Sequence, residues 1–188
     1  MKTSPKSVLA ALSRAAVVSL ALAAPAAGCG GESASGGEAA SPSGGATHEL
    51  VGNPAPPFTM KTANGKGDFS MEKHKGKVVL VDFWATWCEP CKKSFPKLQE
   101  LQTKYKPNLV IVGISQDDEN EGLQAFAKTY GADFPVGWDD GKGIAKKYNP
   151  KSMPSSYIVD KEGVVRFAHT GWHDGEMEEI EKEVKSLL

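Results

Sequence analysis

The chain has 188 residues, of which 40% are hydrophobic and 24% are charged, a composition typical of a globular protein with one main domain. Its 22 basic and 23 acidic residues nearly balance and give a formal net charge of −1. This balance argues against a protein built mainly to bind nucleic-acid phosphates. The 3 cysteines are too few for a small domain held together by several disulfides, and their odd number requires an explanation.

The N-terminal segment, 1–28, has the features of an export signal. Two lysines and an arginine precede a run of small and apolar residues over 15–24, which is shorter than the ~20 residues that a membrane span needs. The sequence Ala-Ala-Gly-Cys at 26–29 resembles a bacterial lipobox, and that resemblance implies that Cys29 receives a diacylglycerol and becomes the first mature residue. The alternative is ordinary cleavage after Ala26, which leaves the cysteine as a free thiol.

Residues 29–49 are rich in glycine, serine and alanine and cannot bury a core, so they predict a flexible tether after the lipidated cysteine. His48 lies in this tether and is expected to be solvated. The remaining segment, 50–188, is long enough for one domain with a well-packed core. A lipid anchor followed by a tether predicts an exported, membrane-anchored bacterial lipoprotein whose domain faces the periplasm or the extracellular side.

The first element expected in the domain is a hairpin. Asn64-Gly65 is a strong two-residue turn signal, and the segments 58–60 and 68–71 flank it. A run of apolar and β-branched residues follows over 77–84. Because this run does not alternate with polar residues, it predicts a strand that is covered on both faces.

Helical and strand patterns then alternate. A helix is expected over 89–104, with a kink at Pro96. The next elements, in chain order, are a buried strand over 109–114, a helix over 121–130, a short strand over 134–136, a short helix over 143–148 and a hairpin of 155–160 and 164–168. A last helix is expected over 174–187, with Asp174 as its N-cap. Early alternation followed by a late hairpin predicts an α/β sandwich with a mixed central sheet.

Two cysteines three positions apart, Cys88 and Cys91, follow the first buried strand and open a helix. At that spacing both sulfurs lie on one helical turn, within reach of a disulfide. At the helix N-terminus, unpaired backbone N–H groups and the helix dipole stabilise the Cys88 thiolate, the species that attacks in disulfide exchange. Pro90 suits the first turn, where no N–H is needed. Cys91 lies one turn deeper, is expected to be more buried, and would resolve the mixed disulfide by attacking Cys88.

The residues Val-Asp-Phe-Trp-Ala-Thr-Trp-Cys-Glu-Pro-Cys at 81–91 resemble the active-site stretch of the thioredoxin superfamily. Pro96 matches the kinking proline of that family's active-site helix, and the segment 153–159 resembles its cis-proline loop. The resemblance implies that Pro154 follows a cis peptide bond. It also implies that the backbone of Met153 pairs with an extended substrate segment beside the nucleophilic cysteine.

The opening hairpin, an extra β-α segment over roughly 110–137 and the lipobox narrow the resemblance to the TlpA/ResA-like membrane-anchored thiol-disulfide oxidoreductases. It covers most of 50–188 and implies a thioredoxin-like three-layer sandwich with an N-terminal hairpin and a central β-α insertion. The sequence departs from the ResA pattern at two positions. Asp82 stands where ResA-like proteins commonly carry asparagine, and Ser94 stands where ResA has a glutamate.

Asp82 is the one acidic residue in the apolar run before the cysteines. Burial raises the pKa of a carboxyl group, which suits proton exchange with Cys91 as the disulfide opens. The alternative is an aspartate at a strand end whose carboxylate is satisfied by backbone donors. Glu89 adds negative charge beside Cys88 and opposes thiolate formation, so we expect a cysteine pKa nearer the ~7 of thioredoxin than the ~3.5 of strongly oxidising relatives.

Two tryptophans, Trp84 and Trp87, flank the cysteines. Both are expected to pack in the core and cover the disulfide, with a substrate contact as the alternative for Trp87. Trp172 and His173 follow the last strand and are candidates for the same rim, although a loop aromatic beside a loop histidine is more often incidental.

The resemblance implies an extracytoplasmic enzyme that reduces protein disulfides through the Cys88–Cys91 dithiol. It requires no dissociable cofactor and no metal. Because the sequence contains no flavin or nicotinamide motif, electrons are expected to come from a membrane partner. By family resemblance, the substrates include apocytochromes c or other periplasmic cysteines, and no nucleic-acid partner is expected.

Two other functions stay open. A thiol peroxidase shares the opening Gly-Asn-Pro-Ala-Pro-Pro-Phe at 52–58, but peroxidases of that kind place Pro seven and Thr three residues before the reactive cysteine, where this chain has Val81 and Ala85. A copper-binding assembly factor on a thioredoxin fold would combine two thiolates with a distant histidine such as His169. Such proteins usually space their cysteines four apart, and here the spacing is three.

Overall fold

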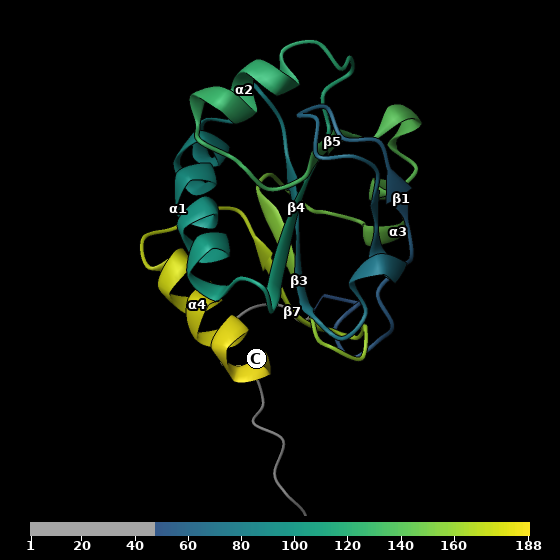
Figure 1. The fold of residues 1–188 in the computed structure, drawn as a ribbon, viewed down its shortest axis with the longest axis vertical. Helices are drawn as coiled ribbons and strands as arrows, with labels where there is room; N and C mark the ends of the chain where they lie inside the picture. The colour runs from purple at the N-terminus through teal and green to yellow at the C-terminus, as the bar shows by residue number, and fades with distance from the viewer. Residues whose placement is uncertain (1–47) are drawn as a thin grey trace, which may run out of the picture. The chain divides into compact units, whose positions relative to one another are not determined.

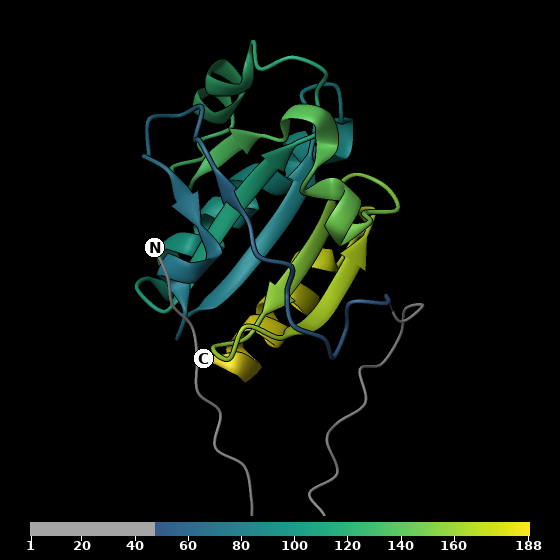
Figure 2. The same ribbon diagram turned by 90° about the vertical axis from the view of Figure 1, so that its right-hand side faces the viewer.

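The computed structural model describes residues 48–188; the predicted signal peptide 1–28, the lipidation at Cys29 and most of the tether 29–49 lie outside the described residues. In the described part, a five-stranded mixed sheet lies between two layers (Figures 1 and 2). The longer helices cover one face, and a short hairpin with a short helix covers the other. This is the three-layer α/β sandwich that the sequence predicts.

The sheet is built around two strands that are buried along their length, β3 (Val78–Trp84) and β4 (Leu109–Ser115). They pair in parallel over seven residues, with Asp82 opposite Gly113. The strand order is β5-β4-β3-β6-β7. The other strands are β5 (Val136–Trp138), parallel to β4, and the antiparallel pair β6 (Ser155–Val159) and β7 (Val165–Thr170).

Side chains alternate between the two faces of β3, and each face packs into its own apolar cluster. Leu80 and Trp84 pack under the helical layer, whereas Val81 and Phe83 pack under the hairpin layer. The helical layer consists of α1 (Glu89–Tyr105), α2 (Leu123–Thr129) and α4 (Glu176–Leu187). The opposite layer consists of β1 (Thr59–Met60), β2 (Phe69–Ser70), a 3₁₀ turn over Met71–His74 and α3 (Ala145–Tyr148).

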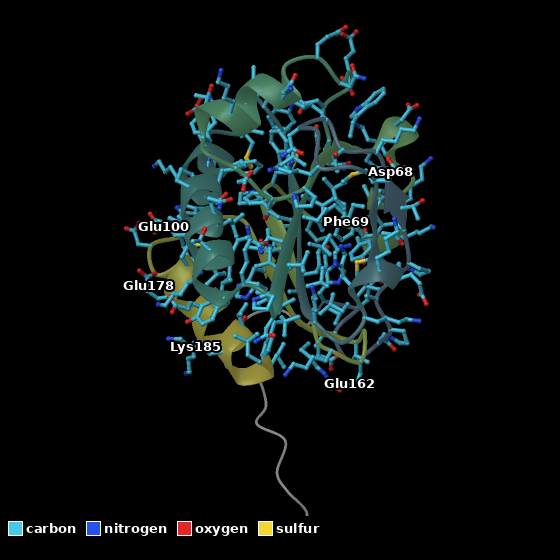
Figure 3. All side chains as sticks on the ribbon, in the orientation of Figure 1. Asp68, Phe69, Glu100, Glu162, Glu178 and Lys185 are labelled. Atoms are coloured by element: carbon cyan, nitrogen blue, oxygen red, sulfur yellow. A yellow bond between two sulfur atoms is a disulfide. The ribbon has the colours of Figure 1, made fainter. Side chains whose placement is uncertain are left out.

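Figure 3 draws the side chains on the same ribbon. Glu100 on α1 and Glu178 and Lys185 on α4 project outward from the helical layer (Figure 3). Phe69 is 2% exposed and stacks on Phe58, so the hairpin layer seals the second cluster. The central strands β3 and β4 are therefore covered on both faces, which explains why they lack polar alternation, whereas the edge strand β7 is partly exposed.

Several predicted boundaries differ from the structure. The hairpin forms, with Met60 opposite Phe69, but its loop runs over 61–68 and not through a two-residue Asn-Gly turn. The short strand predicted over 134–136 is wrong in position, because β5 begins at Val136, directly after a proline that has no N–H to donate. The helix predicted over 121–130 is shorter and starts after Gly122.

Two single-residue predictions are also wrong. Asp174 does not cap the last helix: the N-cap is Gly175, whose φ of 92° lies in the left-handed region that glycine tolerates. His48 is half-buried instead of solvated. Its ring packs edge-on against Tyr157 with the centroids 5.0 Å apart, and its Nε2 lies 3.2 Å from the carbonyl oxygen of Asn149. His48, predicted to lie in the tether, therefore packs against the domain.

Gly137 in β5 provides a test of how the hairpin layer is held. An added Cβ at this position would lie 2.5 Å from the carbonyl oxygen of Lys61 and 2.6 Å from the side chain of Met60. Because backbone cannot yield as a flexible side chain does, we expect Gly137→Ala to lower the free energy of unfolding by about 1–3 kcal/mol. Urea denaturation monitored by tryptophan fluorescence measures this change.

Gly143→Ala is the matched control. Gly143 has an ordinary helical φ of −69°, and nothing lies within 4 Å of its added Cβ. Alanine there should be neutral or stabilise by about 0.4–1 kcal/mol, since it restricts the unfolded chain. Equal destabilisation by the two substitutions would contradict the assigned packing between the hairpin and β5.

Candidate functional site

Cys88 and Cys91 form a disulfide where β3 leads into α1, with their Cα atoms 5.3 Å apart. Cys88 is the N-cap of α1, and its sulfur accepts a hydrogen bond of 3.2 Å from the backbone N–H of Cys91. Cys88 is 4% exposed and Cys91 is fully buried, as the sequence predicted. A donor that points at Cys88 Sγ stabilises negative charge there when the disulfide opens.

The first turn of α1 contains the two residues between the cysteines. Pro90 occupies a position where the helix needs no N–H donor. Glu89 is exposed and forms an ion pair with Lys92, so its charge is partly balanced on the same turn. Ser94 is buried and donates its hydroxyl to the carbonyl oxygen of Cys91 at 3.1 Å. Ser94 thus bonds to the main chain of its own helix.

The loop before Cys88 is held by a residue that the sequence analysis missed. The carboxylate of Asp117, 8% exposed, accepts hydrogen bonds from the backbone N–H of Thr86 at 3.0 Å and from its hydroxyl at 2.6 Å. Ser115 donates to the same carboxylate at 2.7 Å. Asp117 follows β4, whose carboxyl end lies beside that of β3. Functional side chains gather at the carboxyl ends of parallel strands, so an acidic residue at this point was the signal in the sequence that could have identified Asp117.

Asp82 is fully buried on β3. Its side chain lies on the same face as Leu80 and Trp84, which pack in the cluster that contains Cys91. The hydroxyl of Ser156 donates to Asp82 Oδ1 at 2.7 Å, whereas Oδ2 has no hydrogen-bond partner among the described residues. Burial raises the pKa of Asp82 to about 7, and the hydrogen bond from Ser156 lowers it and so limits the rise. Among the described residues, the carboxyl group thus has one hydrogen-bond donor, which is a side chain and not a backbone N–H.

The two tryptophans beside the cysteines differ. Trp84 is fully buried and packs on Phe95 and Phe126, with ring centroids 4.7 Å and 4.5 Å away. Trp87 is 64% exposed, the one large hydrophobic side chain so exposed among residues 48–188. The prediction of core packing is thus confirmed for Trp84 and wrong for Trp87, because the residue immediately before the helix cap points outward.

The predicted cis-proline loop lies beside the same apolar cluster. The Met153–Pro154 peptide bond is cis, as the resemblance implied. The backbone N–H of Gly171 donates to the carbonyl oxygen of Pro154 at 2.8 Å, which brings the loop after β7 alongside. Half-buried Met153 and Trp172 both pack against the cluster that includes the two cysteines. Trp87 precedes Cys88 directly in the chain, and the name apolar rim is used below for Trp87, Met153 and Trp172.

His169, the candidate copper ligand, has other partners. Its Nδ1 lies 2.7 Å from Glu176 and its Nε2 lies 2.5 Å from Glu183, both on α4. Burial lowers the pKa of His169, but the two carboxylates outweigh it and hold the pKa above its usual value. Over residues 48–188, no three His, Cys, Asp or Glu side chains are grouped as metal ligands would be. The geometry therefore gives no support to the copper hypothesis.

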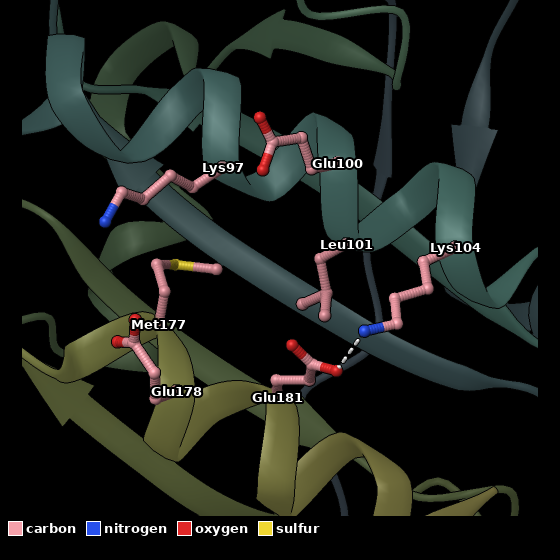
Figure 4. Close-up of a pocket in the computed structure, with 7 residues that line it drawn as sticks. All are labelled: Lys97, Glu100, Leu101, Lys104, Met177, Glu178 and Glu181. Carbon is pink, nitrogen blue, oxygen red and sulfur yellow. Dashed lines mark hydrogen bonds and ion pairs between the residues drawn. The ribbon is translucent and has the colours of Figure 1, made fainter.

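A groove of about 210 Å³ lies between α1 and α4. It is bordered by charged side chains, and Lys104 forms an ion pair of 2.7 Å with Glu181 across it (Figure 4). Its lining residues are Lys97, Glu100, Leu101, Lys104, Met177, Glu178 and Glu181. None of the predicted site residues lies in it, so we regard it as a contact between two helices.

Comparison with known proteins agrees with this geometry. Residues 51–168 match the AhpC/TSA family. The chain is 41% identical over 123 residues to the thioredoxin-like protein YneN of Bacillus subtilis, covering 64% of this chain and 71% of YneN. It is 38% identical over 116 residues to the thiol-disulfide oxidoreductase ResA of Bacillus thuringiensis, covering 61% of this chain and 66% of ResA. The chain thus spans about two thirds of the length of these relatives.

Solved structures show the same fold. A crystal structure from Chlorobium tepidum, described as a thiol:disulfide interchange protein DsbE, superposes with a TM-score of 0.67 at 30% identity and covers 71% of this chain and 94% of that one. A solution structure from Bacteroides thetaiotaomicron, described as a protein disulfide isomerase, gives a TM-score of 0.66 at 29% identity over 73% of this chain and 89% of that one.

The raised pKa of Asp82 makes stability depend on pH with a definite sign. Between pH 3.8 and about 7 the folded state holds a proton that the unfolded state releases, so the free energy of unfolding of the oxidised protein falls as pH rises. The full difference is about 4 kcal/mol, at about 1.4 kcal/mol for each pH unit. Asp82→Asn should remove this slope and stabilise the protein at pH 8, as measured by denaturation of the oxidised form.

Asp160→Asn is a control of opposite sign. Burial raises the pKa of Asp160, but the backbone N–H of Val164 and the Arg166 side chain outweigh it, so the pKa is lowered overall. This substitution should destabilise at neutral pH, with an effect that fades as pH falls below the usual aspartate range. A wild-type slope that persists in Asp82→Asn would contradict the assignment of the titrating group.

Proposed function

Because the chain belongs to the AhpC/TSA family and is a TlpA/ResA-like thiol-disulfide oxidoreductase of the thioredoxin superfamily, we propose that it reduces disulfides of exported proteins, with Cys88 as the nucleophile. The observation that carries the proposal is the Cys88–Cys91 disulfide at the start of α1, with the Cys91 N–H directed at Cys88 Sγ. This donor favours the thiolate at Cys88, so that sulfur is the better attacking group.

The reaction is a two-electron exchange. In the reduced enzyme, the Cys88 thiolate attacks one sulfur of a substrate disulfide, and the other substrate sulfur leaves as a thiolate that takes a proton from solvent. Cys91 then loses its proton, and its sulfur attacks Cys88. The mixed disulfide breaks and releases the second substrate thiolate, which is also protonated. The substrate is reduced to a dithiol, and the enzyme is oxidised to the Cys88–Cys91 disulfide.

Asp82 is proposed as the group that takes the proton from Cys91. It is buried on the face of β3 that packs under α1, and its pKa of about 7 lets it gain or lose a proton near neutral pH. Asp82 Oδ2 has no hydrogen-bond partner among residues 48–188, and this supports the role, since the oxygen can accept a hydrogen bond from a thiol. Solvent has poor access to Cys91, which is fully buried, so an internal acceptor speeds its deprotonation.

The apolar rim is proposed to dock the substrate polypeptide. Trp87 exposes a large aromatic surface one residue before the nucleophile, and Met153 and Trp172 flank the cis-proline loop. Burying such side chains is the usual source of affinity at a protein interface. The backbone of Met153 would pair with an extended substrate segment and align its disulfide with Cys88. Recognition by apolar contacts and backbone predicts broad selectivity among unfolded, cysteine-containing chains.

The cellular setting is a further part of the proposal. We place the enzyme on the outer side of a bacterial membrane, anchored by a lipid on Cys29, reduced by a membrane electron donor, and acting on apocytochromes c or similar exported proteins. The lipobox-like sequence and the ResA-like relatives support this placement. No helix among residues 48–188 has the length and hydropathy to span a bilayer. Mass spectrometry of the mature N-terminus tests the anchor; an unmodified Cys29 would refute it.

Cysteine variants test the proposed order of attack. Cys91→Ser should accumulate a covalent mixed disulfide with substrate, because Cys88 still attacks but nothing resolves the intermediate. Cys88→Ser should form no such adduct and should lose more than 99% of turnover, because the thiolate that begins exchange is absent. Non-reducing electrophoresis and insulin reduction by chemically reduced enzyme measure both effects.

Circular dichroism of both variants provides the folding control. An adduct that forms in Cys88→Ser and not in Cys91→Ser, with both variants folded, would reverse the assigned roles. If both single variants kept their turnover, the proposed dithiol mechanism would be contradicted.

A further inference from the structure

Ser156 on β6 is the one residue of 48–188 that donates a hydrogen bond to the Asp82 carboxyl group. Its Oγ lies 2.7 Å from Asp82 Oδ1, and the two residues are 5% and 0% exposed. A hydrogen bond to a carboxylate in a dry site is stronger than one exposed to water. The contact therefore both orients the carboxyl group and favours its charged form.

The contact follows from strand register. β3 and β6 pair antiparallel with Asp82 opposite Ser156, which places their Cβ atoms about 5 Å apart on one face. That face is the one under α1, because Leu80 and Ile158, two positions away on each strand, both pack in the cluster with Cys91. A shift of one residue in either strand would turn the hydroxyl to the other face.

The neighbours in the same row do not compete for the Ser156 proton. On one side of Asp82 the row continues through Gly113 to Val136, and neither residue has a polar side chain. On the other side of Ser156 lies His169, whose two ring nitrogens face Glu176 and Glu183 on α4. His173 contacts Glu176 from the solvent side. The single hydroxyl proton of Ser156 is thus left for Asp82.

We propose that Ser156 is a positioning residue for proton transfer: by holding Oδ1 of Asp82, it leaves Oδ2 as the oxygen that takes the Cys91 proton. This inference rests on the proposed role of Asp82 as the internal proton acceptor. In the step concerned, the Cys91 S–H bond breaks and its proton goes to Oδ2. The electron pair left on the Cys91 sulfur forms the bond to Cys88, and the pair of the Cys88–substrate bond leaves with the substrate sulfur.

The test compares the Asp82 pKa in Ser156→Ala and Ser156→Thr, measured by carbon-13 NMR of the carboxyl carbon in the oxidised protein, where neither cysteine titrates. Removing the hydroxyl should raise the Asp82 pKa above about 7 by roughly one unit, a tenfold change in its protonation equilibrium. The threonine variant keeps the hydroxyl and should restore the wild-type value. Ser155→Ala is the matched control, because the Ser155 hydroxyl bonds to the carbonyl oxygen of Ser152.

A kinetic readout separates positioning from simple packing. The acid limb of the pH profile for mixed-disulfide resolution should move up with the Asp82 pKa in Ser156→Ala, so that resolution at pH 6 slows about tenfold. In an Asp82→Asn background the same substitution should have no effect on the profile. An unchanged Asp82 pKa in a folded Ser156→Ala variant would overturn the inference, as would an effect that persists without Asp82.

Failure of the underlying function would look different. If the profile of Asp82→Asn equals that of the wild type, Asp82 is not the proton acceptor, whatever its pKa does in Ser156→Ala. The proposal for Ser156 falls in that case too, while the Cys88–Cys91 exchange is untouched.

Discussion

The site depends on the position of Cys88, which ends the loop from β3 and is also the N-cap of α1. A helix must satisfy the N–H groups of its first turn, and here the Cys88 sulfur accepts the one from Cys91. The bond that starts α1 is thus also the bond that stabilises the proposed nucleophile. The remainder of the fold keeps this junction in place: β3 is fixed between β4 and β6, and the Asp117 carboxylate holds the loop at Thr86.

At Cys88 one hydrogen bond serves both the fold and the proposed chemistry, whereas at Asp82 the proposed chemistry lowers the stability of the fold. A carboxyl group at 0% exposure in the middle of a sheet opposes folding whenever it is charged, as its raised pKa records. Proton exchange with a buried cysteine needs a group of this kind within the protein. Ser156 offsets part of this destabilisation with one hydrogen bond to Oδ1, and Oδ2 has no partner in the part of the chain that the structure describes. The arrangement keeps the pKa of Asp82 near neutral pH, so that the carboxyl group can both accept and release a proton.

Much of this was predictable from the sequence because the signals were local. The unbroken apolar runs of β3 and β4, the Cys-x-x-Cys spacing and the cis-proline segment each lie within a short stretch, and each prediction is confirmed. Trp87 was misjudged because apolar character alone does not tell which side of a helix cap a residue faces. The N-cap of α4 is Gly175 and not the expected Asp174, because the chain adopts a positive φ there that composition does not reveal.

The residues that the sequence could not assign are those joined across strands and layers. Thr86 and Asp117 are 31 positions apart, and Asp82 and Ser156 are 74 apart. Their contacts depend on strand order and register, which a single sequence constrains only weakly. The same holds for His169, whose partners on α4 are placed by the packing of the last helix against the sheet.

The most direct test of the account is the reduction potential of the Cys88–Cys91 pair in a soluble fragment, residues 48–188, equilibrated in graded thiol/disulfide buffers. Tryptophan fluorescence reports the redox state, since Trp84 packs in the same cluster as the disulfide. A reversible two-electron transition near −270 mV, the value of a cytosolic reductant such as thioredoxin, is predicted for an enzyme that reduces exported proteins. A potential near −120 mV, typical of a disulfide-forming oxidant, would contradict the reductive direction, and the absence of any reversible transition would contradict the oxidoreductase itself.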